Sequence, residues 1–292
     1  MSNNIILGTA KIGIDNYGFS SKSLKSSNED LFSCAKKNGI LMLDTSPRYG
    51  DAESIIGDYH ANNDFKFFIS TKVDNLLKND QSSESKIFHS VEKSIERMQV
   101  SKINTLFLHQ NELEILSDSK ILKALEKLKN EGLVSKIGSS IYNYQECQFT
   151  IDCDIYDVVQ VPINIMDTSI YSELLKKNES FDTIIFARSI FLQGVLFNRS
   201  QIYNHIKQAK YLTKYLEKID LLVKKYEISL IEMSCSFVLS LRRISNIIVG
   251  TNSTKNLSDI KDASLIELPE ELILELRALS DQYKEWGNPK NW

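Results

Sequence analysis

Short runs of apolar, mostly β-branched residues recur along the chain and alternate with longer segments in which apolar positions follow the period of an α-helix. Apolar runs of about four to eight residues are typical of strands that are buried on both faces, as in a parallel sheet. The pattern therefore predicts strands at Ile5–Thr9, Leu41–Thr45, Phe67–Lys72, Thr105–His109, Lys136–Ser140, Val158–Val161, Ile184–Ser189 and Ile247–Gly250.

The segments between these runs carry helix signals. One helix is predicted to end at Gly39, and a second, over Ser119–Glu131, to end at Gly132, because glycine adopts the left-handed conformation that closes many helices. Long helices are also expected over Ser85–Met98 and Ile206–Tyr226, where apolar positions recur at helical spacing.

Strands that alternate with helices, without a Pro/Gly/Ser-rich linker between them, predict a single (β/α)8 TIM barrel over residues 1–292. The alternative is a doubly wound open sheet. That fold would favour a G-x-G-x-x-G turn after the first strand, and the segment Gly8–Gly13 lacks this spacing. The polar and aromatic segment 281–292 is expected to fold over one end of the barrel.

Composition narrows the classes of function. The chain has 42% hydrophobic and 25% charged residues and a net charge of −3, which does not indicate a nucleic-acid or anionic membrane partner. No apolar stretch approaches the roughly 20 residues of a membrane span, and the N-terminus lacks the features of a signal peptide. The four cysteines are scattered and are expected to be buried free thiols rather than disulfides or zinc ligands. We expect a cytoplasmic protein.

Polar side chains end three successive apolar runs: Asp44, Lys72 and His109. In a (β/α)8 barrel the active site lies at the C-terminal ends of the strands, so these side chains are expected to meet in one pocket. Strands often end in polar residues because loops face water, but this explanation is weak for Asp, Lys and His in succession. Tyr49, in the loop after Asp44, adds a phenol to the set.

These four residues suggest carbonyl chemistry. A lysine ammonium stabilises the phenolate form of a nearby tyrosine, and a carboxylate keeps that lysine charged. Such a tyrosine can protonate a substrate oxygen near neutral pH, and His109 could hydrogen-bond the same carbonyl oxygen. The set holds no obvious nucleophile, so reduction would need a hydride from a cofactor.

Several motifs resemble those of aldo-keto reductases. LDTSPRYG is similar to the family's D-T-x-x-x-Y-G signature, and STK and LFLHQ resemble its lysine and histidine strands, in the same order. LGTAKIG, EGLVSKIGSS, VVQVPIN, RSIFLQGVL and IIVGTNSTKNL extend the resemblance over nearly the whole chain. It implies an NAD(P)-dependent reductase of a small-molecule carbonyl substrate, with Tyr49 as general acid in a catalytic tetrad with Asp44, Lys72 and His109.

The resemblance also implies a site for NADP, with NAD as the other possibility. Ser140 and Gln160 would hold the nicotinamide carboxamide, although Ile141 replaces an asparagine that many members have there. Arg188 stands where many have a tyrosine stacked on the nicotinamide, and a guanidinium can also stack. Only Lys255 offers positive charge where the 2′-phosphate would bind. The implied cofactor contacts are Gly8, Thr9, Ser140, Gln160, Arg188, Ser189, Leu192, Gln193, Gly194, Gly250, Thr251, Asn252, Lys255 and Asn256.

Two other functions remain open on the sequence. A Schiff-base aldolase would use Lys72 as nucleophile, but this requires a neutral lysine and Asp44 acts against it. A non-catalytic nucleotide-binding regulatory subunit would bind the cofactor without turnover. By analogy with bacterial members, the substrate is expected to be a sugar-derived aldehyde or ketone. The sequence does not indicate an oligomeric state. Aromatic residues expected to line the substrate pocket, or else to serve only in packing, are Tyr17, Phe19, Trp286 and Trp292.

Overall fold

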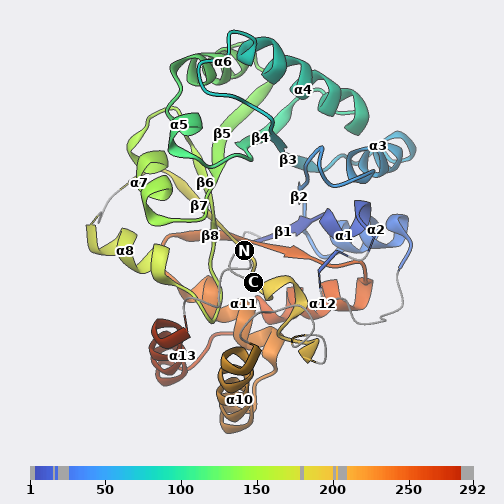
Figure 1. Cartoon of the computed structure of the whole chain (residues 1–292). Helices are drawn as coiled ribbons and strands as arrows, with labels where there is room; N and C mark the ends of the chain where they lie inside the picture. The colour runs from blue at the N-terminus through green and yellow to red at the C-terminus, as the bar shows by residue number, and fades with distance from the viewer. Residues whose placement is uncertain are drawn as a thin grey trace.

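Eight parallel strands pair in sequence order and close into a barrel (Figure 1). The computed structural model describes residues 4–15, 17–18, 26–177, 181–199, 202 and 209–283. The predicted (β/α)8 fold is confirmed. The strands are β1 (Ile5–Gly8), β2 (Met42–Asp44), β3 (Phe68–Val73), β4 (Ile103–Leu108), β5 (Val134–Ser140), β6 (Val158–Pro162), β7 (Ile184–Arg188) and β8 (Ile244–Gly250).

Each predicted strand is present, and the largest differences are at the starts of β4, β5 and β8. These strands begin at Ile103, Val134 and Ile244, two or three residues before the predicted starts, because polar residues near their N-terminal ends interrupt the apolar pattern. The register that closes the barrel pairs Ile5 of β1 with Ile247 of β8.

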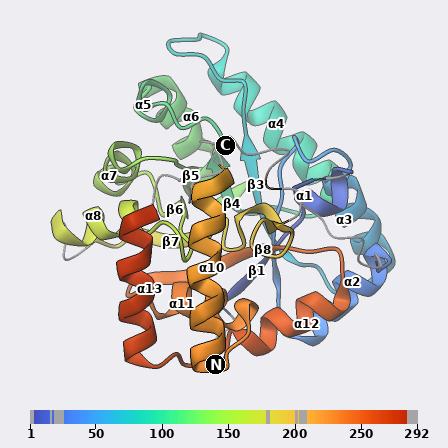
Figure 2. The ribbon, with the colours of Figure 1, turned by 60° about the horizontal axis from the view of Figure 1, so that its bottom comes forward.

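The helices surround the barrel, and Figure 2 shows α10 and α13 side by side on its outer face. An ion pair between Lys225 and Glu275 joins these two helices, with 2.7 Å between Nζ and Oε1. The helices are α1 (Ala10–Gly13), α2 (Asn28–Lys37), α3 (Ala52–Asn62), α4 (Ser83–Met98), α5 (Leu113–Leu116), α6 (Ser119–Asn130), α7 (Tyr144–Asp152), α8 (Ser169–Lys177), α10 (Ala209–Tyr226), α11 (Leu230–Ser240), α12 (Thr254–Ala263) and α13 (Glu270–Tyr283), with a 3₁₀ turn η1 (Leu192–Gly194).

The predicted helix ends are confirmed at two glycines. Gly39 and Gly132 adopt φ values of 71° and 75°, in the left-handed region that other residues enter at a cost. The predicted helix over 206–226 is described from Ala209 onward. The expectation for the C-terminal segment lies outside the described residues from position 284, as do Phe19, Trp286 and Trp292.

Two further expectations concern the state of the cysteines and the presence of membrane-spanning segments. All four cysteines are free thiols, but Cys34 and Cys153 are only partly buried, whereas Cys147 and Cys235 are fully buried as expected. Among the described residues, no helix combines the length and the apolar character that crossing a membrane requires.

His60 is a buried histidine whose contacts fix it as neutral. Its Nδ1 lies 2.8 Å from the Met98 carbonyl oxygen, and its Nε2 accepts a hydrogen bond of 3.0 Å from the Phe67 N–H. A protonated ring would lose that acceptor, and burial lowers the pKa of His60 below its ordinary value of 6.5.

The free energy of unfolding should therefore fall as pH drops below about 6.5, because the unfolded chain then takes up a proton that folded His60 does not. Above that pH both states are neutral and the stabilisation is complete. His60→Gln should reduce this pH dependence, and His89→Gln, on an exposed position of α4, should leave it unchanged. Urea unfolding at about pH 7.5 and 5.5 measures both. An unaltered slope in His60→Gln would contradict the assignment.

Candidate functional site

Asp44 and Lys72 form a buried ion pair at the C-terminal ends of β2 and β3. The Lys72 ammonium donates to Asp44 Oδ2 at 2.8 Å and to the Thr45 carbonyl oxygen at 2.9 Å. Burial on its own lowers the pKa of Lys72, but the Asp44 carboxylate and Tyr49 outweigh it, so the pKa is raised. Lys72 is therefore a charged donor at the bottom of the site.

Tyr49 reaches the pair from the β2–α3 loop. The loop turns through a hydrogen bond of 2.9 Å from the Tyr49 N–H to the Ser46 carbonyl oxygen, and the next residue, Gly50, has a φ of 52°. A side chain at Gly50 would also collide with the Gly13 carbonyl oxygen, 2.2 Å from an added Cβ. This turn places the Tyr49 ring centroid 5.0 Å from the Lys72 ammonium.

His109 follows β4 and lies across from Tyr49. Its backbone N–H donates to the Val73 carbonyl oxygen at 2.9 Å, which ties it to the end of β3. Its ring is nearly perpendicular to that of Tyr49, with centroids 6.4 Å apart. Burial and, second, the Lys72 charge lower the pKa of His109 to about 4, so the ring is neutral near neutral pH.

A cavity of about 650 Å³ contains these four side chains and extends past β7 to the β8–α12 loop. This volume lies within the range of small-molecule and cofactor sites. The sequence-predicted residues that line it are Gly8, Asp44, Tyr49, Lys72, His109, Ser140, Gln160, Arg188, Ser189, Gln193, Gly194, Gly250, Thr251, Asn252 and Asn256.

Three predicted cofactor residues do not line the cavity. Thr9 is buried, and its hydroxyl donates to the Asp44 backbone carbonyl at 3.1 Å, so it joins β1 to β2. Leu192 is fully buried among apolar residues. Lys255 is exposed in the first turn of α12.

Gln160 contacts the ion pair from the opposite side of the barrel. Its Nε2 donates to Asp44 Oδ1 at 2.6 Å, so within the described part of the chain its Oε1 remains available as an acceptor. Ser140 of β5 lies opposite Gln160 of β6 in the sheet register, and both line the cavity. Neighbouring strands therefore present a hydroxyl and an amide oxygen beside the Asp44–Lys72 pair.

Arg188, at the end of β7, is fixed against the end of β5. Its Nη2 donates to the Ile141 carbonyl oxygen at 2.8 Å, and its Cζ lies 4.2 Å from the centroid of the Tyr142 ring. Its Nε is buried without a hydrogen-bond partner in the described part of the chain. One face of the guanidinium thus packs on Tyr142, and a buried donor remains unused.

Sequence reasoning assigned no role to Lys11 or Tyr142. Lys11 lines the cavity, and burial lowers its pKa; no carboxylate within the described residues lies inside 4 Å of its ammonium. Tyr142 also lines the cavity, as does Tyr17, which was expected. Each missed residue lies within a few positions of a motif residue, but only the folded chain shows what it contacts.

The cavity carries an excess of positive charge. Among the described residues, its lining includes the cations Lys11, Lys72 and Arg188 but a single carboxylate, Asp44, which is paired with Lys72. The chain as a whole has a net charge of −3, so this excess is local to the cavity. An anionic ligand is what such a lining favours.

No group of three potential metal-ligating His, Cys, Asp or Glu side chains occurs among the residues that the structure describes.

Comparison with known proteins gives one family match. The model of the aldo/keto reductase family matches residues 4–281. A comparison with curated protein sequences gave no match. The solved structures that resemble the chain include the glycerol dehydrogenase from Gluconobacter oxydans, at 20% identity and a TM-score of 0.73, covering 96% of this chain and 92% of that one. They also include an aldo-keto reductase enzyme from a Medee basin deep-sea metagenome library, at 17% identity and a TM-score of 0.65, covering 94% and 90%. At these identities the structural likeness shows the shared fold.

Proposed function

The chain belongs to the aldo/keto reductase family, and we propose that it is an NAD(P)H-dependent reductase of aldehydes or ketones. The observation that carries the proposal is the buried Asp44–Lys72 pair with Tyr49 beside it, at the strand ends that line the cavity. Fold and family membership support carbonyl oxidoreduction, and the placement of these side chains supports the proposed division of roles.

In the proposed reaction Tyr49 donates a proton to the carbonyl oxygen of the substrate. Lys72 is held charged by Asp44, and its ammonium stabilises negative charge as it develops on the phenol oxygen. Gln160 and Thr45 complete the hydrogen bonds of the pair, which keeps it in one geometry. A bound nicotinamide would supply the hydride for the carbonyl carbon.

The residues of the cavity fit a dinucleotide. Lys11 and Arg188 supply uncompensated positive charge for its phosphates, and the buried Arg188 Nε is a donor without a partner in the described chain. Gln160 Oε1 and the Ser140 hydroxyl can accept from and donate to a carboxamide. We propose NADP as the cofactor, in keeping with the family resemblance. NAD is the alternative, because Lys255 is exposed and offers only a screened contact to a 2′-phosphate.

The raised pKa of Lys72 favours this reaction over Schiff-base chemistry, which requires the neutral amine. Binding of NADPH and NADH, followed by nicotinamide oxidation over a panel of aldehydes, ketones and sugars, tests the proposal. Turnover of a carbonyl with either cofactor supports it. Cofactor binding without turnover over the whole panel would instead favour a regulatory subunit.

Arg188 offers a test of the cofactor site by itself. Arg188→Leu should raise the Kd of NADPH by about tenfold or more, since it removes one positive charge and the hydrogen-bond donors of a residue that lines the cavity. Arg199→Leu is the matched control, because Arg199 pairs with Asp220 and does not line the cavity. Quenching of protein fluorescence by NADPH measures both. An unchanged Kd in Arg188→Leu would remove Arg188 from the proposed site.

A further inference from the structure

Glu53 is a buried carboxylate in the first turn of α3 to which the proposed reaction gives no role. Its side chain is 2% exposed and accepts hydrogen bonds from β3 and from α4. Oε1 accepts from the Thr71 hydroxyl at 2.7 Å, and Oε2 accepts from the Ser94 hydroxyl at 3.2 Å. Nε and Nη2 of Arg97 lie 2.8 and 2.6 Å from the same Oε2. One carboxylate therefore joins α3 to a barrel strand and to the next helix.

The hydrogen bond to Thr71 reaches the strand that carries Lys72. Successive side chains of a strand point to opposite faces of the sheet, so these two neighbours separate. Lys72 points into the barrel and lines the cavity, whereas Thr71 points outward and meets Glu53. Thr71 is fully buried, so its hydroxyl has no access to water. The contact with α3 is thus made one residue away from the buried ammonium.

At its other end Glu53 is connected to Tyr49. The Tyr49 carbonyl oxygen accepts from the Ala52 N–H at 3.1 Å, so the turn that presents the phenol leads directly into α3. One turn after Glu53, Gly57 packs on the C-terminal end of α4, where an added Cβ would lie 1.9 Å from the Arg97 carbonyl oxygen. This close packing holds α3 in place, so the position of its first turn is passed on to Tyr49.

We propose that the Glu53–Thr71 hydrogen bond sets the position of Tyr49 relative to Lys72, which makes Glu53 and Thr71 positioning residues for proton transfer. The inference rests on the proposed reductase function. The bond lies behind the site and joins the helix that follows Tyr49 to the strand that bears Lys72. The Tyr49 ring centroid lies 5.0 Å from the Lys72 ammonium, and the electrostatic contact between them depends on that distance.

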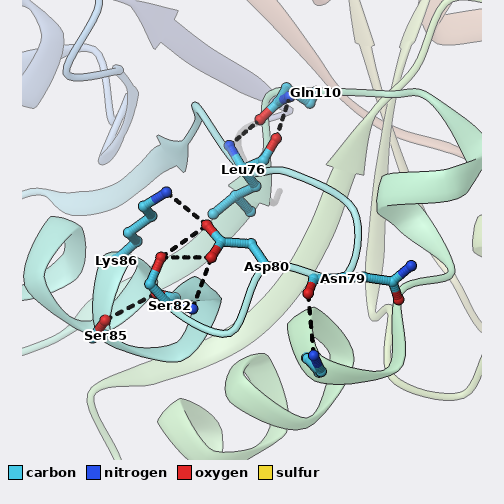
Figure 3. A network of polar contacts seen from close by, with 8 residues as sticks. Leu76, Asn79, Asp80, Ser82, Ser85, Lys86 and Gln110 are labelled. Atoms are coloured by element: carbon cyan, nitrogen blue, oxygen red, sulfur yellow. Dashed lines mark hydrogen bonds and ion pairs between the residues drawn. The ribbon is translucent and has the colours of Figure 1, made fainter.

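Ser94 offers a matched control, because other contacts hold its helix in place. Asp80 anchors the start of α4: its carboxylate accepts from the Ser82 N–H at 2.8 Å and from the Lys86 ammonium at 2.6 Å (Figure 3). Ser94→Ala therefore removes one hydroxyl from Glu53 without changing how α4 begins. It also leaves the bond between α3 and β3 intact.

The position of the Tyr49 ring is measured without substrate or cofactor. NMR spectra of ¹³C-tyrosine-labelled protein report the surroundings of each ring, and the Tyr49→Phe spectrum identifies the Tyr49 signals. Thr71→Val keeps the shape of the side chain but loses the hydroxyl, and it should shift or split these signals. Thr71→Ser, which retains a hydroxyl, and Ser94→Ala should leave them in place. Unmoved signals in Thr71→Val, or an equal shift in Ser94→Ala, would overturn the proposal whether or not the protein reduces a carbonyl.

Turnover gives the second measurement. Thr71→Val should lower kcat for carbonyl reduction by about 10- to 100-fold, since misplacing a reacting group by about an ångström can have an effect of this size. The Kd of NADPH should stay close to that of the wild type, because Thr71 is not among the described residues that line the cavity. Thr71→Ser should recover most of the lost kcat, and Ser94→Ala should keep it.

A wild-type kcat in Thr71→Val, or an equal loss of kcat in Ser94→Ala, would overturn the proposal, the latter because it would assign the effect to a general loss of stability. Thr71→Ala, with the same expected results, replaces Thr71→Val if that variant does not fold. If the wild type turns over no carbonyl, the reductase function fails, and the Tyr49 ring signals alone decide whether the Glu53–Thr71 bond positions the ring.

Discussion

Replacing Tyr49 by Phe is expected to lower kcat for carbonyl reduction by about 10²- to 10⁴-fold, because the group that protonates the substrate oxygen is lost. The ring itself remains, so its contact with Lys72 and the closed turn at Gly50 persist. The Kd of NADPH should therefore stay close to that of the wild type. Steady-state turnover and fluorescence titration of the same preparations measure the two effects separately.

Tyr17→Phe is the matched control for this substitution. Tyr17 lines the same cavity, and burial, followed by the proximity of Tyr49, raises its pKa, which disfavours proton release. Its loss should leave kcat within a few-fold of the wild type, since it is not the proton donor. A wild-type kcat in Tyr49→Phe, or an equal loss in Tyr17→Phe, would mean that Tyr49 is not the general acid.

Lys72→Met is expected to affect both turnover and stability. Removing the ammonium leaves the Asp44 carboxylate buried without its counter-charge, which typically costs about 3–5 kcal/mol of unfolding free energy. The chemical step should slow as well, because no cation then stabilises charge on the Tyr49 oxygen. Urea unfolding and single-turnover reduction measure the two losses.

The double variant Asp44→Asn/Lys72→Met separates these effects. It removes both charges, so much of the lost stability should return, while Gln160 Nε2 can still donate to the side-chain amide oxygen that the Asp44→Asn substitution retains. Turnover should remain low, since the cation is absent in both variants. A double variant that regained wild-type turnover would show that Lys72 acts only through stability.

Much of the fold was predictable from the sequence, because a strand that is buried on both faces is a short continuous run of apolar residues. The runs ending at Asp44 and Lys72 became β2 and β3 almost residue for residue. Prediction was poorer where polar residues enter a strand, as at the start of β8. The cofactor residues Thr9 and Lys255 were predicted from resemblance alone, and the cavity does not include them.

Sequence by itself determined the barrel and the grouping of Asp44, Lys72 and His109 at its C-terminal end, because the positions of strands and of their ends follow from local periodicity. It also determined the family resemblance, through the motifs around these residues. Tertiary structure alone decided that Gln160 donates to Asp44, that Arg188 packs on Tyr142 and that Thr71 donates to Glu53. These contacts join residues from different strands, helices and loops. They depend on sheet register and loop hydrogen bonds to within about an ångström, a precision that hydrophobic periodicity does not carry.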